Sequence, residues 1–146
     1  MRILFIGDIT GSPGRRILQE QLPSLKQEYG IDLTIANVDN AAHGLGVSPK
    51  IAQNLREQGV DVMTGGNHLF DRKEIVPELD DMPWLLRGAN YSGEVPGAYV
   101  YIDEIKGVPF LVTHLIGRTF MGTYENPFTQ YDKVIEEHGK DIAVRI

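Results

Sequence analysis

Three short apolar runs, each followed by a turn and then by a helix-like segment, most constrain what this chain can fold into. The runs span residues 3–6, 32–37 and 60–63. The first is apolar at every position, which is expected of a central strand buried on both faces. The order βαβαβα implies parallel strands joined by right-handed crossovers. The sequence therefore predicts an α/β fold.

The first two helices carry start and stop signals. Ser12-Pro13 and Ser48-Pro49 each pair a capping residue with a proline suited to the first helical position. The first helix is expected to stop at Gly30 and to be kinked or divided at Pro23, because proline removes a backbone donor. The second is expected to run to Gly59.

After residue 71 the alternation changes. Asp71 followed by Glu74 predicts an N-cap with a capping-box partner at the start of a short third helix. An antiparallel hairpin is then expected, because two strand-like runs flank Lys106-Gly107. The remaining expected elements are a short strand at 84–86, a helix at 127–138 and a strand beginning near 141.

Length and composition narrow the classes of function. The 146 residues fit one domain. A net charge of −6 without any run of Lys or Arg argues against large nucleic acids and anionic membranes as partners. A small phosphate substrate stays open, because a metal can supply positive charge. The chain has no cysteine, and its first apolar run is too short for a signal peptide or membrane span, so a cytoplasmic location is expected.

Each of the first three strand-like runs ends in residues that bind hard metals. Asp8 follows the first run, Asp39-Asn40 the second and Asn67-His68 the third. The carboxyl ends of parallel strands share one edge of a sheet, so these side chains can converge. Carboxylate and amide oxygens with imidazole suit Mn, Fe or Zn, and two neighbouring metals need a bridging carboxylate. The sequence predicts a metal site at this edge.

These motifs carry a family resemblance. The run from Met1 to Asp8, the Asp39–Ala42 turn, Gly66–His68 with Asp71, and Gly117–Phe120 resemble the YmdB family of calcineurin-like metallophosphoesterases. The resemblance covers essentially the whole chain. It implies a metallophosphoesterase β-sandwich flanked by helices, with two divalent metal ions (Mn, Fe or Zn). It also implies hydrolysis of small phosphodiesters such as 2′,3′-cyclic nucleotides.

The resemblance also implies residue roles. By position, Asp8 holds the first metal, Asp39 bridges both, Asn40 supports the first and Asn67 holds the second. His68 is the catalytic residue beside the substrate phosphate.

This chain departs from the family pattern in two ways. The family shows Glu where Asp39 stands, and a shorter side chain changes the metal spacing. Family members also continue well beyond this point and carry their remaining histidine ligands there. We therefore expect one domain over residues 1–146 that is truncated at its C-terminus, with an incomplete metal centre. Such a half would expose apolar sheet surface, which a second copy or a partner segment would cover.

The other candidates are less specific. His43 and Arg118 are candidate substrate contacts, with a solvated loop histidine and a surface salt bridge as the alternatives. His114 ends a predicted strand and could reach the metal edge, although a structural role is favoured. His138 suits a helix C-terminus, and Asp71 is expected to cap a helix.

Two functions follow. The first is a phosphodiesterase in which two metals activate a bridging hydroxide while His68 stabilises or protonates the leaving oxygen. The second is a non-catalytic half-site that binds metal or nucleotide and needs a partner segment. A dinucleotide-binding Rossmann unit is disfavoured, because residues 7–11 lack the G-x-G-x-x-G spacing.

Overall fold

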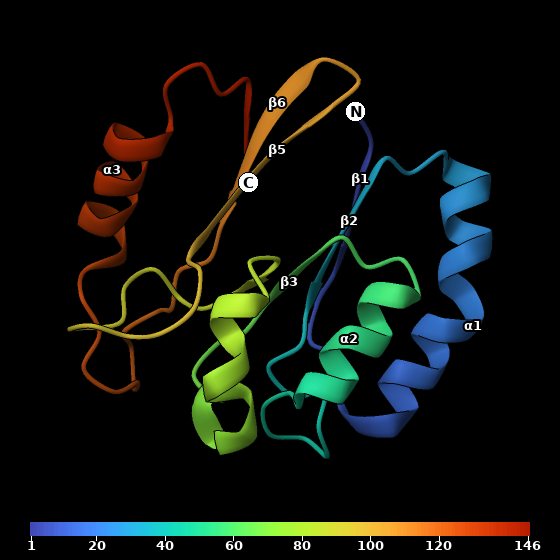
Figure 1. The fold of residues 1–146 in the computed structure, drawn as a ribbon, viewed down its shortest axis with the longest axis horizontal. Coiled ribbons are helices and arrows are strands. Elements are labelled where there is room, and N and C mark those ends of the chain that lie inside the picture. Colours follow the sequence, from blue (N-terminus) through green and yellow to red (C-terminus); the bar gives the residue numbers. More distant parts are fainter.

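The computed structural model describes residues 1–146 and has four layers of secondary structure. Figure 1 shows two helices on the right, parallel strands in the middle, a hairpin beside them and a third helix on the left. In chain order the elements are β1 (Ile3–Ile6), α1 (Gly11–Tyr29), β2 (Leu33–Asn37), α2 (Pro49–Glu57), β3 (Val62–Thr64), the 3₁₀ helices η1 (Leu69–Asp71) and η2 (Lys73–Asp81), β4 (Leu85–Leu86), β5 (Val100–Ile105), β6 (Val108–Thr113), α3 (Pro127–His138) and β7 (Val144–Arg145). The expected α/β fold is confirmed.

The first sheet is parallel and has the strand order β1-β2-β3-β4. Alternate side chains of its strands point to opposite faces. One face packs with α1, α2 and η2 around a core that includes Leu22, Ala36 and Met63. The other face, which includes Ile35, packs against the second sheet.

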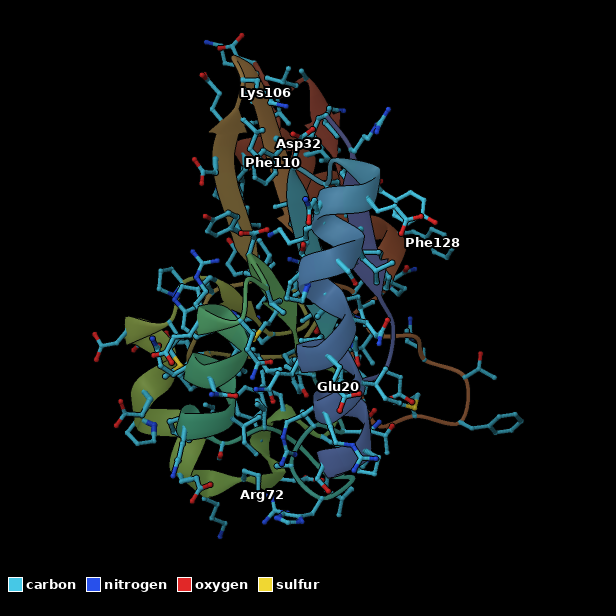
Figure 2. All side chains as sticks on the ribbon, turned by 90° about the vertical axis from the view of Figure 1, so that its right-hand side faces the viewer. Glu20, Asp32, Arg72, Lys106, Phe110 and Phe128 are labelled. Atoms are coloured by element: carbon cyan, nitrogen blue, oxygen red, sulfur yellow. The ribbon has the colours of Figure 1, made fainter.

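The second sheet contains the expected hairpin. β5 pairs antiparallel with β6, and β7 joins β6 in parallel. Phe110 of β6 is buried between the two sheets, and α3 covers the outer face of β6 through Val134 and Leu111. Figure 2 shows Phe110 in this inter-sheet layer, with Lys106 and Asp32 close together at one end of the molecule and Arg72 at the other.

The prediction that the first strand is central and buried on both faces is wrong. β1 lies at the edge of its sheet, and Ile3 and Phe5 are 37% and 59% exposed. These two residues pair in register with Leu33 and Ile35, so they face the second-sheet side. The second sheet does not extend over β1, which leaves this apolar face open.

The expected start of α1 is wrong, and Pro23 does not divide the helix. The helix begins at Gly11 with Thr10 as N-cap, instead of at Ser12-Pro13, because the Gly11 N–H donates to the Asn40 carbonyl (2.9 Å) and needs no capping hydroxyl. The helix also continues through Pro23. Pro23 is exposed, so packing of the opposite helix face outweighs the lost backbone bond.

Of the other predicted caps and elements, all but one of those compared are confirmed. Gly30 ends α1 in the left-handed conformation, and the Ser48 hydroxyl accepts the Ile51 N–H at the start of α2; both were predicted. The capping role of Asp71 is wrong, since Arg72 precedes η2 without a side-chain cap and Asp71 binds a histidine instead. The short strand at 85–86, the helix at 127–138 and the final strand are confirmed. None of the helices combines the length and apolar character needed to span a bilayer.

Candidate functional site

The turns after β1, β2 and β3 meet at the carboxyl end of the first sheet. They border an open cleft of about 330 Å³. All four predicted metal ligands line it, and the loop after β6 closes its other side. The lining residues are Asp8, Asn37, Asp39, Asn40, Gly66, Asn67, His114, Leu115, Ile116, Gly117 and Met121. The convergence expected from parallel topology is therefore present.

Asp8 and Asn40 connect the first two turns. The Asn40 side-chain amide donates to Asp8 Oδ1 at 2.7 Å. Asp8 has φ of 45°, a left-handed conformation that is uncommon outside glycine and that concentrates at functional sites. The amide oxygen of Asn40 stays available to a ligand, because only its nitrogen is used in this bond.

Asp39 connects the second and third turns. The residue is 7% exposed, and its carboxylate accepts the backbone N–H of His68 at 3.0 Å. Burial raises the pKa of Asp39, although the hydrogen bond from His68 opposes the shift. No Lys or Arg forms an ion pair with this carboxylate. A buried carboxylate without a cation is a fitting metal ligand.

Gly66 is required by the position of Asp39. A Cβ built on Gly66 would lie 2.7 Å from Asp39 Oδ2 and 3.0 Å from Asp39 Cγ. Any larger residue would push the carboxylate away from the turn. Gly66 therefore serves close approach of a carboxylate to the backbone, whereas a Cβ built on its neighbour Gly65 would meet the Leu69 side chain.

Two supporting residues were missed from the sequence. Asn37 donates to Thr64 Oγ1 at 3.3 Å and accepts the Asp39 N–H at 3.3 Å, so it orients Asp39. Asn37 lies two residues after the buried Ile35 on β2, so the two-residue period of a strand could have predicted that both side chains face the same side of the sheet. The Tyr91 hydroxyl donates to the Gly66 carbonyl at 2.9 Å, and no sequence pattern links these distant residues.

Tyr91 also packs between aromatic rings. Phe70 and Tyr124 contact it edge-on with centroid distances of 5.2 and 5.1 Å. Burial raises the pKa of the Tyr91 phenol well above its ordinary value, so the hydroxyl stays protonated and keeps its donor role. Tyr91 thus fixes the Gly66-Asn67 turn from the β4 side.

The ring of His68 does not line the cleft. Its Nδ1 contacts Asp71 Oδ2 at 2.7 Å, and the side chain is 35% exposed. Because a carboxylate only accepts, the Nδ1–H donates to Asp71 and Nε2 is left without a protein partner. His68 therefore stands at the rim with one ring nitrogen available.

The two predicted substrate contacts lie outside the cleft. His43 is exposed and has φ of 57° in the turn after Asn40. Arg118 lines a neighbouring groove that shares only Gly117 with the cleft, and it forms no ion pair. Neither residue is brought next to the candidate metal ligands.

The long turn that follows β2 is held by two arginines. Arg72 donates to the carbonyls of Ala42 (2.9 Å) and Leu45 (3.1 Å), and Arg15 donates to the Ala41 carbonyl. Figure 2 places Arg72 at the end of the molecule opposite Asp32, which lies just before β2. These bonds fix Asp39-Asn40 by immobilising the turn behind them.

The donor set suits a divalent metal, but it is sparse. Two carboxylates, three side-chain amides and one imidazole line the cleft. No three acidic or histidine side chains lie close enough together to enclose an ion by themselves.

Comparison with known proteins identifies the family. Residues 4–146 match the family described as YmdB-like protein. The chain belongs to the YmdB-like family. It is 44% identical over 140 residues to the 2′,3′-cyclic-nucleotide 2′-phosphodiesterase of Bacillus subtilis. The match covers 96% of this chain and 53% of that protein.

Two solved structures share the fold. A hypothetical protein from Thermus thermophilus superposes with a TM-score of 0.87 at 38% identity, over 94% of this chain and 54% of its own. A novel phosphatase from Mycoplasma pneumoniae gives 0.86 at 30% identity, over 93% and 50%. This YmdB-like chain thus spans about half the length of the relatives it matches.

Proposed function

We propose that this YmdB-like chain supplies one side of a metal-dependent site that hydrolyses small phosphodiesters. The observation that carries the proposal is the convergence of Asp8, Asp39, Asn40 and Asn67 on one cleft, where Asn40 contacts Asp8 at 2.7 Å. The name of the Bacillus subtilis relative supports 2′,3′-cyclic nucleotides as the substrate class.

The ligand roles follow from these contacts. Asp39 lies between the other two turns, so it is the residue suited to bridge two divalent ions of Mn, Fe or Zn. Asp8 and Asn40 would hold one ion together, and Asn67 would hold the second. Bound metal supplies positive charge that neutralises the phosphoryl oxygens in the transition state.

His68 supplies the proton chemistry in this proposal. Asp71 fixes the Nδ1 side of the ring, so Nε2 faces away from that carboxylate and can donate to the leaving oxygen when the ring is protonated. The hydrogen bond from the His68 N–H to Asp39 keeps this residue beside the bridging ligand.

The proposal is tested by metal content and by hydrolysis. We expect wild type to bind Mn²⁺ in equilibrium dialysis and to open 2′,3′-cyclic AMP when Mn²⁺ is present, with the product isomer separated by chromatography. Asp39→Asn should lower Mn²⁺ affinity by about 10–100-fold or more. Glu28→Gln, an exposed carboxylate change on α1, is the matched control and should leave both unchanged. Equal Mn²⁺ binding by wild type and Asp39→Asn would contradict the proposed site.

A second candidate is a half-site that binds metal without turnover. The sparse acidic and histidine donors and the open edge of β1 favour it. Here a second copy or a partner segment would complete the ligand shell and cover the exposed sheet. Mn²⁺ binding lost in Asp39→Asn, without hydrolysis by the isolated chain, would favour this candidate over the complete enzyme.

A further inference from the structure

The segment between β4 and β5 contacts both walls of the cleft. One wall is the Gly66-Asn67 turn after β3, and the other is the segment from His114 to Gly117 after β6. The Tyr91 hydroxyl donates to the Gly66 carbonyl at 2.9 Å. Its neighbour Asn90 binds the opposite wall, since the Ile116 N–H donates to Asn90 Oδ1 at 2.8 Å. The two walls are therefore joined through two consecutive residues.

The Asn90 side chain uses its acceptor and both of its donor hydrogens on this second wall. The residue is 0% exposed. Its Nδ2 donates to the carbonyls of Ile116 (2.8 Å) and Glu125 (3.0 Å), while Oδ1 accepts the Ile116 N–H. The Asn90 carbonyl also accepts the Glu125 N–H at 2.9 Å. An ionised Asp at this position could only accept, so it could not make the two donated bonds.

The loop over residues 117–124 has few bonds of its own. Its one internal backbone hydrogen bond runs from the Met121 N–H to the Arg118 carbonyl, at 3.2 Å. Gly117 and Met121 of this loop line the cleft. The position of this part of the wall therefore depends on the two ends of the loop, which Asn90 ties together.

The segment that carries Asn90 is itself held against the wall. Gly88 pairs with His114 in a parallel bridge, and the Ala89 N–H donates to the His114 carbonyl at 2.7 Å. A Cβ built on Gly88 would lie 2.8 Å from the side chain of Ile116, so the two backbones approach closely. Asn90 is thus in register with the wall that it binds.

We propose that Asn90 is a positioning residue for the substrate, and that Asn90 and Tyr91 together form one brace that sets the distance between the two walls of the cleft. Both residues act through backbone groups of the walls, so neither has to touch the substrate. The inference rests on the proposed function, because it requires that a small phosphodiester binds between these walls.

The first test needs no ligand. Asn90→Ala removes the acceptor of the Ile116 N–H, so this amide should lose its protection in hydrogen exchange measured by NMR, relative to the core amide of Met63. Val60→Ala is the matched control, because Val60 is buried before β3, at the end of the sheet away from the cleft. That variant should lower stability but keep the relative protection of Ile116. Wild-type protection of Ile116 in Asn90→Ala would contradict the brace.

The second test is the affinity for adenosine 2′,3′-cyclic phosphorothioate, a slowly hydrolysed analogue, measured by calorimetry in the presence of Mn²⁺. A displacement of about 1 Å in a site can cost about a hundredfold, so Asn90→Ala should weaken analogue binding about tenfold or more. Mn²⁺ affinity in Asn90→Ala should stay at the wild-type value, because Asn90 does not line the cleft. Val60→Ala should bind the analogue as wild type does.

The third test asks whether the two residues act together. Tyr91→Phe removes only the hydroxyl that binds the Gly66 carbonyl, so its folding is not at risk, and it should also weaken analogue binding. Because either substitution breaks the same brace, the double variant should bind no more weakly than Asn90→Ala alone. Additive losses would show that the residues act separately and would overturn the brace.

The outcomes separate this inference from the proposed function. Wild-type binding of the analogue that stays unchanged in Asn90→Ala and Tyr91→Phe would overturn the brace and leave the proposed function standing. If Asn90→Ala does not fold, Tyr91→Phe decides alone, since wild-type affinity in that variant would overturn the brace. Absence of analogue binding by wild type at millimolar concentration would overturn both.

Discussion

At the scale of single residues, the contact between Gly66 and Asp39 sets the geometry of the candidate site. Gly66→Ala would place a methyl group 2.7 Å from Asp39 Oδ2, so the carboxylate must move and weaken its bond to the His68 N–H. We expect a loss of about 1–3 kcal/mol in the free energy of unfolding and weaker Mn²⁺ binding. Urea denaturation and equilibrium dialysis measure these two quantities.

Gly7→Ala is the matched control for this substitution. No atom lies within 4 Å of a Cβ built on Gly7, and its backbone has no positive φ. It should change neither stability nor Mn²⁺ binding by a comparable amount. Equal losses in the two variants would mean that the Gly66 effect is not specific to Asp39.

The contact between Asp71 and His68 allows a prediction about the tautomer of a ring. Removing the carboxylate in Asp71→Ala takes away the acceptor of the Nδ1–H. We expect the neutral ring to shift toward the tautomer protonated at Nε2, as measured by ¹⁵N shifts of His68, and any hydrolysis to fall about tenfold or more. Mn²⁺ affinity should stay unchanged, because Asp71 does not line the cleft.

Asp81→Ala controls for the loss of an acidic side chain nearby. Asp81 is exposed at the end of η2. It should leave the His68 ¹⁵N shifts at their wild-type values. An unchanged tautomer in Asp71→Ala would show that the carboxylate does not orient the ring.

At the scale of elements, one ion pair joins the two sheets at the end away from the cleft. Lys106, in the turn between β5 and β6, contacts Asp32 Oδ1 at 2.6 Å, and Asp32 lies just before β2. The hydrogen bond from Lys106, aided by the Arg2 N–H, lowers the pKa of Asp32 below its ordinary value near 3.8. A carboxyl group whose pKa is lowered by folding stabilises the fold at pH values above its pKa in the unfolded state. This stabilisation is lost as the pH falls through its pKa in the folded state.

We therefore expect Lys106→Met to lower the free energy of unfolding at pH 7, with the difference from wild type shrinking below about pH 4. Urea denaturation at pH 7, 5 and 3 measures this. The effect should also shrink at high salt, because the Lys106 side chain is 75% exposed. Lys140→Met, an exposed lysine outside any ion pair, should show no such pH dependence. A constant difference from pH 7 to 3 would contradict the ionic origin.

The sequence predicted the elements whose signals are local. The Ser48 cap, the Gly30 stop and the strand pair around Lys106-Gly107 depend on neighbouring residues, and the structure confirms them. The local signals that failed were replaced by contacts with other residues. The Asn40 carbonyl accepts the Gly11 N–H at the start of α1, and the Asp71 carboxylate accepts from the His68 ring instead of capping η2. The strand ends of the candidate site follow from parallel topology, whereas the contact between Tyr91 and Gly66 depends on a packing that no local pattern encodes.

At the scale of the whole molecule, the open side of β1 combines an unpaired strand edge with exposed apolar side chains. β1 pairs with β2 on one side only, so its other edge exposes backbone donors and acceptors. Ile3 and Phe5 extend the apolar inter-sheet face beyond the second sheet. An exposed edge strand with apolar side chains promotes pairing with another chain.

We expect the isolated chain to associate reversibly through this edge, with a mass in sedimentation velocity that rises with concentration. Phe5→Lys should keep the chain monomeric for two reasons. A charged side chain on an edge strand opposes pairing, and the substitution removes the exposed aromatic ring of β1. Phe128→Lys is the matched control: Phe128 is 80% exposed on α3, and Figure 2 shows it projecting from the side of the molecule. That variant should associate as wild type does. If wild type is monomeric at every concentration, or if both lysine variants lose association equally, then the edge of β1 is not the surface through which copies meet.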